Sequence, residues 1–318
     1  MFARGIALAL GCALWLAANG TAIAASCSAS ASGIAFGYAS AGSLLGQTTI
    51  GAISEGCTGG WGTYGTLAMC NAIGAGNNSV SQANRRMTFG ANFISYQLYS
   101  DAAFTIPFAY PGNATVSIPY SGSANAYTTT NVYAKILSPS TGLPAGTYID
   151  TYTAPTQIYI TFDATAPNTP IVCGTGGPYV SASPTFQVSV NYLASCRVSA
   201  APLSFGTASA LIANIDAQTN LSVTCTLGAP YSVSLGPGQA TGATTSARQM
   251  SGPGGAISYS VYRDAGRTAN WGNQIGVDTV AGTGSGAAQS IPVYGRVPPQ
   301  TLVSTGSYSD TIIVTLTY

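Results

Sequence analysis

The chain contains two copies of one sequence pattern, offset by roughly 160 to 169 residues. Four pairs of segments match in the same order: CSASASGIAFGYAS at 27–40 with CRVSAAPLSFGTAS at 196–209, RRMTFGANFISYQLYSD at 85–101 with RQMSGPGGAISYSVYRD at 248–264, NVYAK at 131–135 with PVYGR at 292–296, and AGTYIDTY at 145–152 with TGSYSDTI at 305–312. Matches that keep their order and spacing across a whole half indicate a tandem duplication. We therefore expect two domains of one kind.

Composition and periodicity predict that both domains are built from strands. The 318 residues include only 9 basic and 8 acidic side chains, no His, and 39 Gly. Long surface helices normally draw on Glu, Lys and Arg, whereas short strands joined by Gly-rich and Ser-rich turns fit this composition. In the segment TFQVSVNYLASC, apolar Phe186, Val188, Val190 and Tyr192 alternate with polar residues, as in a strand with one buried face. The fold class is predicted to be all-β.

The two halves differ by one strand. Each repeat ends with a strand after its Tyr-x-Asp motif, near QIYITF at 157–162 in the first half and TIIVTLTY at 311–318 in the second. Only the first half continues into a further strand, at 185–192. We expect this strand to complete the first domain within the same chain. The second domain would then keep an open apolar groove, which another chain must fill because exposed core and free strand edges promote aggregation.

The first 25 residues are predicted to be removed. A basic residue at Arg4, an apolar run at 6–18 and small residues before Ala24 and Ala25 are typical of a secretory signal peptide. The run is shorter than the roughly 20 residues that span a bilayer. The expected organisation is a signal peptide at 1–25, a first domain at 26–195 with its completing strand at 185–192, and a second domain at 196–318.

An exported chain with paired cysteines is expected to form disulfides. Six cysteines remain after removal of the signal peptide, and six allow 15 connectivities. The repeat narrows this choice, because Cys27 and Cys57 are spaced like Cys196 and Cys225. We pair each of these within its own half. The two cysteines without counterparts in the second half, Cys70 and Cys173, are then expected to bridge to each other.

The second half resembles the spore coat protein U domain, as found in Csu-type pilins of archaic chaperone–usher pili. The resemblance runs from residue 196 to residue 318 and rests on seven ordered blocks. These blocks are the paired cysteines Cys196 and Cys225, SFG at 204–206, RQM at 248–250, ISYSVYRD at 257–264, NWGNQIG at 270–276, VYGR at 293–296 and GSYSDTIIVTLTY at 306–318. The first half is similar but carries FTIPFAYPGN in place of the Trp-Gly block.

This resemblance implies an incomplete immunoglobulin-like sandwich whose groove receives a strand from another subunit. The implied partners are a periplasmic chaperone, an outer-membrane usher and the N-terminal donor strand of the next pilin. We expect the groove to involve Ile312, Val314, Leu316 and Tyr318. Cleavage near Ala25 leaves no room for a donor strand ahead of Cys27. A subunit that accepts but does not donate belongs at the fibre tip, so we expect a pilus tip adhesin at the cell surface that supports biofilm formation.

The first domain would then carry the adhesive surface, which binds an abiotic or host surface. Its aromatic and apolar side chains gather in loops rich in Gly and Pro. The candidates for surface binding are Trp61, Tyr64, Phe104, Ile106, Phe108, Tyr110, Tyr120 and Tyr127. Each of these side chains could instead fill the sandwich core. Two other functions remain open, namely a carbohydrate-binding pilus tip and an adaptor or minor shaft pilin.

Enzymatic and nucleic-acid functions are disfavoured. A catalytic triad that uses His is impossible in a chain without His. The same absence, with no Cys-x-x-Cys pair, argues against a metal site, and we expect no cofactor. A formal net charge of +1 provides no basic patch for nucleic acid. The acidic residues and arginines that recur in both repeats are expected to be structural, with Tyr148 and Tyr308 at sandwich corners.

Overall fold

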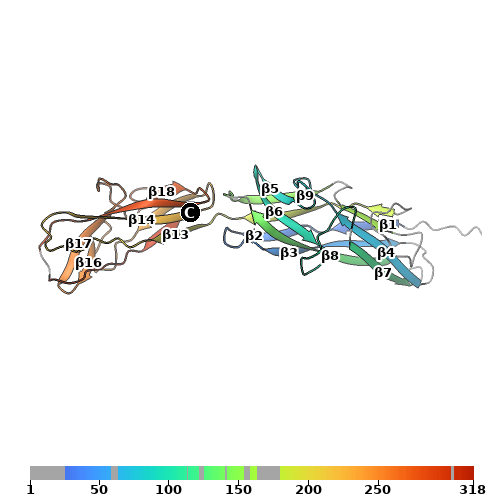
Figure 1. Cartoon of the computed structure of the whole chain (residues 1–318), viewed down its shortest axis with the longest axis horizontal. Helices are drawn as coiled ribbons and strands as arrows, with labels where there is room; N and C mark the ends of the chain where they lie inside the picture. The colour runs from blue at the N-terminus through green and yellow to red at the C-terminus, as the bar shows by residue number, and fades with distance from the viewer. Residues whose placement is uncertain are drawn as a thin grey trace, which may run out of the picture.

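A computed structural model describes residues 26–58, 64–112, 114–121, 125–139, 142–153, 158–162, 180–301 and 304–318. These residues form strands and turns without any helix, so no helix in this part of the chain could cross a membrane. Figure 1 shows two groups of strands arranged end to end, with β1–β12 in one and β13–β20 in the other. The all-β prediction is confirmed.

The first domain is a sandwich of two sheets. Its larger sheet has, in spatial order, β1 (Ser26–Ala31), β3 (Thr48–Thr58), β8 (Ala126–Pro139), β6 (Asn92–Tyr99), β5 (Arg85–Phe89), β9 (Gly146–Tyr152), β12 (Phe186–Tyr192) and β2 (Ile34–Ala39). The smaller sheet has the order β11 (Val180–Ala182), β10 (Ile158–Phe162), β4 (Tyr64–Ile73) and β7 (Ala114–Ser121). One hydrophobic core fills the space between the two sheets.

Strand β12 lies inside the first domain's larger sheet. It runs antiparallel to β9, from Phe186 opposite Tyr152 to Tyr192 opposite Gly146. On its other side it pairs in parallel with β2. Its alternate side chains are buried, and Val188 is 0% exposed. The segment predicted to complete the first domain therefore contributes a full row of side chains to that domain's core.

The second domain repeats this plan with fewer strands. One sheet has the order β13 (Cys196–Ala200), β14 (Ile215–Cys225), β19 (Ala288–Val297), β17 (Gly255–Tyr262) and β16 (Arg248–Gly252). The other has the order β18 (Val280–Thr283), β15 (Pro230–Leu235) and β20 (Val314–Thr317). A separate hydrophobic core lies between them. Within the described residues, no strand takes the places that β9, β12 and β2 hold in the first domain.

A buried arginine holds the strands of each domain together. Arg85 and Arg248 are both 0% exposed. The Arg85 guanidinium donates to the carbonyl oxygens of Ile73 at 2.6 Å and Phe108 at 3.0 Å, among others. Arg248 donates to the equivalent backbone positions, including the Trp271 carbonyl oxygen at 2.8 Å. Because carbonyl groups need partners when they are buried, each arginine satisfies several chain segments at once.

The Tyr-x-Asp motif fixes the corner of each sandwich, as predicted. The Tyr148 hydroxyl donates to the Pro144 carbonyl oxygen at 2.9 Å, and the Tyr308 hydroxyl donates to the Ser304 carbonyl oxygen at 2.7 Å. The aspartate two residues later accepts a second set of bonds. Asp150 accepts from the Tyr96 hydroxyl at 2.7 Å, and the same pairing recurs in the second domain. These motifs are structural in both repeats.

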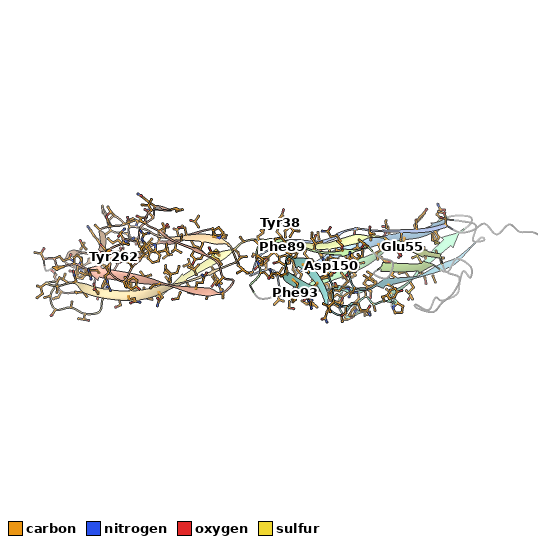
Figure 2. The ribbon with its side chains drawn as sticks, turned by 90° about the horizontal axis from the view of Figure 1, so that it is seen from above. Tyr38, Glu55, Phe89, Phe93, Asp150 and Tyr262 are labelled. Atoms are coloured by element: carbon orange, nitrogen blue, oxygen red, sulfur yellow. A yellow bond between two sulfur atoms is a disulfide. The ribbon has the colours of Figure 1, made fainter. Side chains whose placement is uncertain are left out.

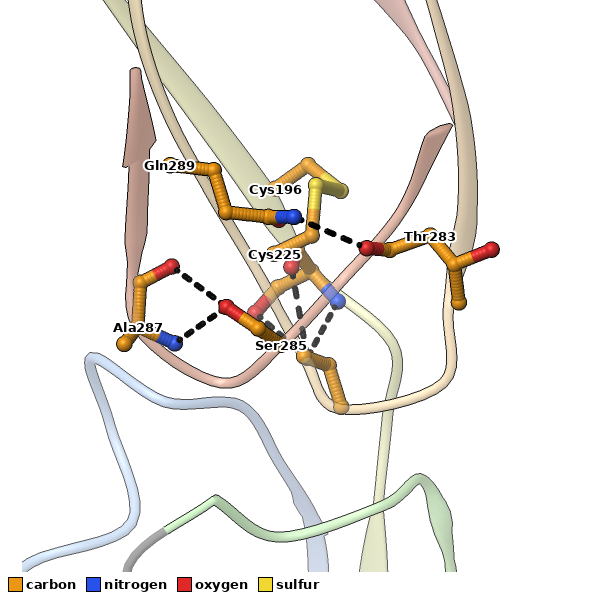
Figure 3. The surroundings of a disulfide bond; sticks show 8 residues. Cys196, Cys225, Thr283, Ser285, Ala287 and Gln289 are labelled. Atoms are coloured by element: carbon orange, nitrogen blue, oxygen red, sulfur yellow. Dashed lines mark hydrogen bonds between the residues drawn. A yellow bond between two sulfur atoms is a disulfide. The ribbon is translucent and has the colours of Figure 1, made fainter. Parts of the chain in front are cut away.

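Disulfides link neighbouring strands at matching positions in the two domains. Cys27 bonds to Cys57 across β1 and β3, and Cys196 bonds to Cys225 across β13 and β14. Both pairings were predicted from the repeat. Figure 3 shows the second bridge beside the turn at 283–287, close to loops of the first domain. Cys70 is also disulfide-bonded, but its predicted partner, Cys173, lies outside the described residues.

Replacing Arg85 by Met should destabilise the first domain by about 3 kcal/mol, because several buried carbonyl groups lose their donor. The matched control is Arg86→Met on the next residue of β5, where the guanidinium lies 4.3 Å from the centre of the Phe93 ring (Figure 2). That control should cost less than about 1 kcal/mol. Urea unfolding of the full chain followed by near-ultraviolet circular dichroism measures both values. Equal losses would contradict the role assigned to Arg85.

Candidate functional site

The second domain has an open groove where the first domain has a strand. In the first domain, β12 lies between β9 and β2. The repeat aligns β9 with 306–312 and the β2 region with 203–208. The backbone of segment 306–312 pairs with β16 through Ser309, which exchanges two hydrogen bonds with Ser251, of 2.9 and 3.1 Å. Among the described residues, no strand lies between these two segments.

The groove has a volume of about 920 Å³ and is lined mostly by apolar residues. One wall is formed by 200–211 and the other by 304–312. Core residues form its floor, including Met250, Val261 and Val293. In the first domain the equivalent space is filled by the buried side chains of β12. The groove therefore has the apolar lining and the flanking segments of a slot for one β-strand.

Among the described residues that line the groove, Asp310 is the only charged one. Its carboxylate is already engaged, because it accepts hydrogen bonds from the Gln239 backbone amide at 2.9 Å and the Tyr259 hydroxyl at 2.7 Å. Burial, together with this carboxylate, raises the pKa of Tyr259 well above its ordinary value. Tyr259 therefore stays neutral and keeps donating its hydrogen bond at physiological pH. The groove offers no free charge and favours an apolar occupant.

The four predicted groove residues divide into two groups. Ile312 and Val314 line the groove and pack against the second core. Leu316 also packs against that core but is absent from the lining. Tyr318 is 61% exposed and also lies outside the lining. Most of the residues that line the groove belong to the walls at 200–211 and 304–311. These walls were not predicted, because segments without strand structure show no periodicity in the sequence.

The predicted surface-binding residues do not form one cluster. Tyr127 is 60% exposed near the start of β8, where β3 pairs it beside β1, and Figure 1 shows β1 at the end of the first domain that is remote from the second domain. Strands β4 and β7 place the backbones of Tyr64 and Tyr120 at this same end, although their side chains are not described. Trp61 lies outside the described residues. The remaining four candidates belong to the segment between β6 and β7.

In the segment 100–110, one predicted binding residue belongs to the core and the others are half-buried or exposed. Phe108 is 1% exposed, so its assignment to a binding surface is wrong. Phe104 is half-buried and meets the Tyr99 ring edge-on, with ring centres 5.5 Å apart. Ile106 and Tyr110 are exposed, at 50% and 39%.

The second domain repeats the construction of this segment. Asp101 accepts hydrogen bonds from the backbone amides of Thr105 and Ile106, as Asp264 does from Thr268 and Ala269. The Phe108 amide donates to the Leu98 carbonyl oxygen at 2.9 Å, and the Trp271 amide donates to the Val261 carbonyl oxygen at 2.8 Å. Phe108 therefore fills the place of the buried Trp271. Aligning the two repeats residue by residue would have revealed this role.

Exposed apolar residues also occur near the domain junction, and the sequence did not single them out. Tyr38 is 72% exposed and Leu45 is 69% exposed. Figure 2 shows Tyr38 and Phe89 at the end of the first domain that faces the second. Two strand-to-strand loops meet there, where Pro144 forms a bridge with Leu227. These residues lie at the opposite end of the first domain from Tyr127.

Comparison with known proteins gives a consistent result. A family model described as Spore Coat Protein U domain matches residues 14–155 and 182–315. Protein U of Myxococcus xanthus is 33% identical over 128 residues, which are 36% of this chain and 71% of that protein. The second match begins at residue 182, ahead of Cys196, and therefore includes β12 together with the second domain.

The solved structures that align with this chain include two pilus subunits. A chaperone–tip subunit pre-assembly complex of the archaic chaperone–usher Csu pili of Acinetobacter baumannii aligns with a TM-score of 0.53 at 14% identity, over 92% of this chain and 100% of that chain. The CupB6 tip adhesin of Pseudomonas aeruginosa aligns with a TM-score of 0.37 at 11% identity, over 93% and 95% of the two chains. The first similarity supports the pilin-type fold.

A peptide with the sequence of 185–193 should bind the groove, because β12 already fills the equivalent slot in the first domain. Refolding the full chain with an excess of this peptide should raise its soluble yield and the Tm of the second domain, since a bound ligand stabilises the folded state. The control peptide carries Asp in place of Val188 and Val190. If the two peptides act equally, the groove does not select a strand.

Proposed function

Because this chain belongs to the spore coat protein U domain family, we propose that it is the adhesive tip subunit of a chaperone–usher pilus. The observation that carries the proposal is the asymmetry between its domains. The first is completed by β12 from the same chain, and the second keeps the equivalent slot open. Such a subunit is joined to a fibre through one domain and presents the other to the outside.

The groove is filled by the N-terminal donor strand of the next pilin. A donor strand contributes backbone hydrogen bonds to both walls and alternate apolar side chains to the floor, which is the general form of β-strand addition. The internal precedent is β12, which precedes its own pilin-type domain and is inserted into the other one. In the assembled fibre, the neighbouring subunit provides between chains what β12 provides within one chain.

Before assembly, a periplasmic chaperone occupies the same groove. An open apolar slot exposes core residues to solvent, so the subunit needs a partner from the moment it folds. The outer-membrane usher then exchanges the chaperone for the donor strand as the fibre is secreted. This route requires export, which agrees with the signal peptide expected at 1–25 and with disulfides in the folded domains.

The adhesive surface lies at the end of the first domain remote from the second. Tyr127 is exposed there, and strands β4 and β7 bring the backbones of Tyr64 and Tyr120 to the same end. An apolar contact of roughly 300 Å² would contribute about 7 kcal/mol before the costs of association. Many fibres on one cell act together, so a modest affinity per tip is sufficient for attachment and biofilm formation. The natural target is an abiotic or host surface.

Antibody labelling of intact fibres tests the tip position. Gold-labelled antibodies raised against the first domain should bind at fibre ends. A subunit that accepts a donor strand and exposes its other domain terminates the polymer. Antibody against a shaft pilin, used in parallel, should label the whole length. If the antibody against this chain labels the whole fibre instead, the chain is an adaptor or minor shaft pilin.

Attachment assays test the adhesive surface. Cells that carry Trp61→Ala with Tyr127→Ala should bind polystyrene at least about tenfold less, because small losses per tip multiply across many fibres. Tyr38→Ala is the matched control, since Tyr38 is equally aromatic and 72% exposed but lies at the domain junction. Equal loss in both variants would contradict the proposed surface. Inhibition of wild-type attachment by one particular free glycan would favour a carbohydrate-binding tip.

A further inference from the structure

A cluster of three polar side chains lies inside the core of the first domain. Glu55 on β3 is 3% exposed and Asn71 on β4 is 0% exposed. Thr130 on β8 is half-buried beside them. Figure 2 shows Glu55 within the sandwich of the first domain. Strands β3 and β8 are neighbours in the larger sheet, whereas β4 belongs to the opposite sheet. This buried polar triad therefore spans the two layers of the sandwich.

The three side chains are in mutual contact. The Thr130 hydroxyl donates to Glu55 Oε1 at 2.6 Å. Asn71 Nδ2 lies 3.1 Å from the same carboxyl oxygen and 3.1 Å from Thr130 Oγ1. A hydroxyl group, a carboxyl group and the amide group of a carboxamide thus meet at hydrogen-bond distance. The amide carbon, Asn71 Cγ, is bonded to Nδ2, the atom that contacts the hydroxyl.

The hydrogen bonding of the triad is incomplete. Glu55 Oε2 and Asn71 Oδ1 are buried, and neither has a hydrogen-bond partner among the described residues. A proton on Glu55 would provide a donor in a cluster that otherwise has two unsatisfied acceptors. Burial raises the pKa of Glu55, although the hydrogen bonds from Thr130 and Asn71 oppose this rise. The carboxyl group is therefore suited to take up and release a proton.

The fold does not require polar residues at these positions. The register of the strands, together with the matching contacts of Arg85 and Arg248, aligns the triad with three apolar residues of the second domain. These residues pack in the second core, and they are Val223, Val233 and Ile291. Burying polar groups costs free energy unless they are fully paired. The first domain therefore buries three polar side chains at a cost in free energy, and the second domain folds with apolar residues at the same positions.

We propose that the buried polar triad forms an intramolecular ester cross-link between Thr130 and Asn71, with Glu55 as the catalytic residue. The hydroxyl is the nucleophile, the carboxamide carbon is the electrophile, and the carboxyl group moves protons between them. A nucleophile held beside its target by a rigid core gains the large rate advantage of an intramolecular reaction. An adjacent carboxyl group that accepts the hydroxyl proton provides the activation that a threonine needs.

The reaction is balanced without any further reagent. Thr130 Oγ1 forms a bond to Asn71 Cγ while its proton passes to Glu55 Oε1. The bond between Cγ and Nδ2 then breaks, and Glu55 delivers a proton to the leaving nitrogen, which departs as ammonia. Glu55 returns to its starting protonation state. No group is oxidised or reduced, and the chain loses one ammonia molecule.

Such a bond would join the two sheets of the first domain covalently. Thr130 is on β8 and Asn71 is on β4, which lie in opposite layers. The disulfide between Cys27 and Cys57 links neighbouring strands of one sheet. The ester would therefore prevent the separation of the two layers, which that disulfide does not restrain.

Mass spectrometry of the full exported chain tests the proposal. The mass should be lower than that of the disulfide-bonded sequence by about 17 Da. This is the mass of the ammonia that the Asn71 carboxamide releases when it acylates the Thr130 hydroxyl. After reduction and trypsin digestion, the peptide that ends at Arg85 carries Asn71, and the peptide 87–135 carries Thr130. These two peptides should appear as one linked species. Hydroxylamine, which cleaves esters but not amides, should separate them.

Variants locate the chemistry. Glu55→Gln and Thr130→Val should both retain the full mass, whereas Thr130→Ser keeps a nucleophile and should still lose ammonia. Thr128→Val, on the same face of β8, is the matched control and should behave like the wild type. If a variant does not fold, the wild-type digest alone decides the question.

Two unlinked tryptic peptides of full mass from the wild-type chain would overturn the proposal. A loss of mass that persists in Thr130→Val would also overturn it. Neither result would affect the tip assignment, which rests on the groove of the other domain.

Discussion

A β-strand can complete only one sheet, and the position of β12 therefore determines the state of both domains. Between β9 and β2, it buries a row of alternate side chains and closes the first core. The second domain is built on the same repeat and has no strand of its own for the equivalent position in the described part of the chain. Its groove is the direct consequence, because the walls and floor are present while the occupant is missing.

The groove keeps its shape because interactions outside it hold the walls. Arg248 satisfies carbonyl groups from several segments beneath the floor. Side-chain hydrogen bonds attach the 304–312 wall, although this wall forms no strand: the Tyr308 hydroxyl accepts from the Gly254 amide, and Asp310 accepts from the Gln239 amide and the Tyr259 hydroxyl. The first domain has the same arginine and the same corner next to a filled slot. The framework is therefore independent of the occupant, which allows one strand to be exchanged for another.

The repeat made much of this structure predictable. Nearly equal spacings of 30 and 29 residues identified two disulfides, and the alternation in 185–192 identified a strand with one buried face. The same repeat contained the correction for Phe108, which aligns with the buried Trp271 and fills the same place in the core. The groove walls could not be predicted, since residues without regular structure have no periodicity. Glu55 was also missed, because only the packing of the two sheets shows that this polar side chain points inward.

The connection between the domains determines how a pulling force enters the first domain. Only residues 193–195 separate the end of β12 from the start of β13. A force on the second domain therefore acts first on β12, along its own axis. Seven residue pairs join β12 to β9, and β2 holds its other edge. Force along a strand loads these pairs together, whereas force across a strand would break them one after another. The strand that closes the first domain is thus also placed to resist load from a fibre.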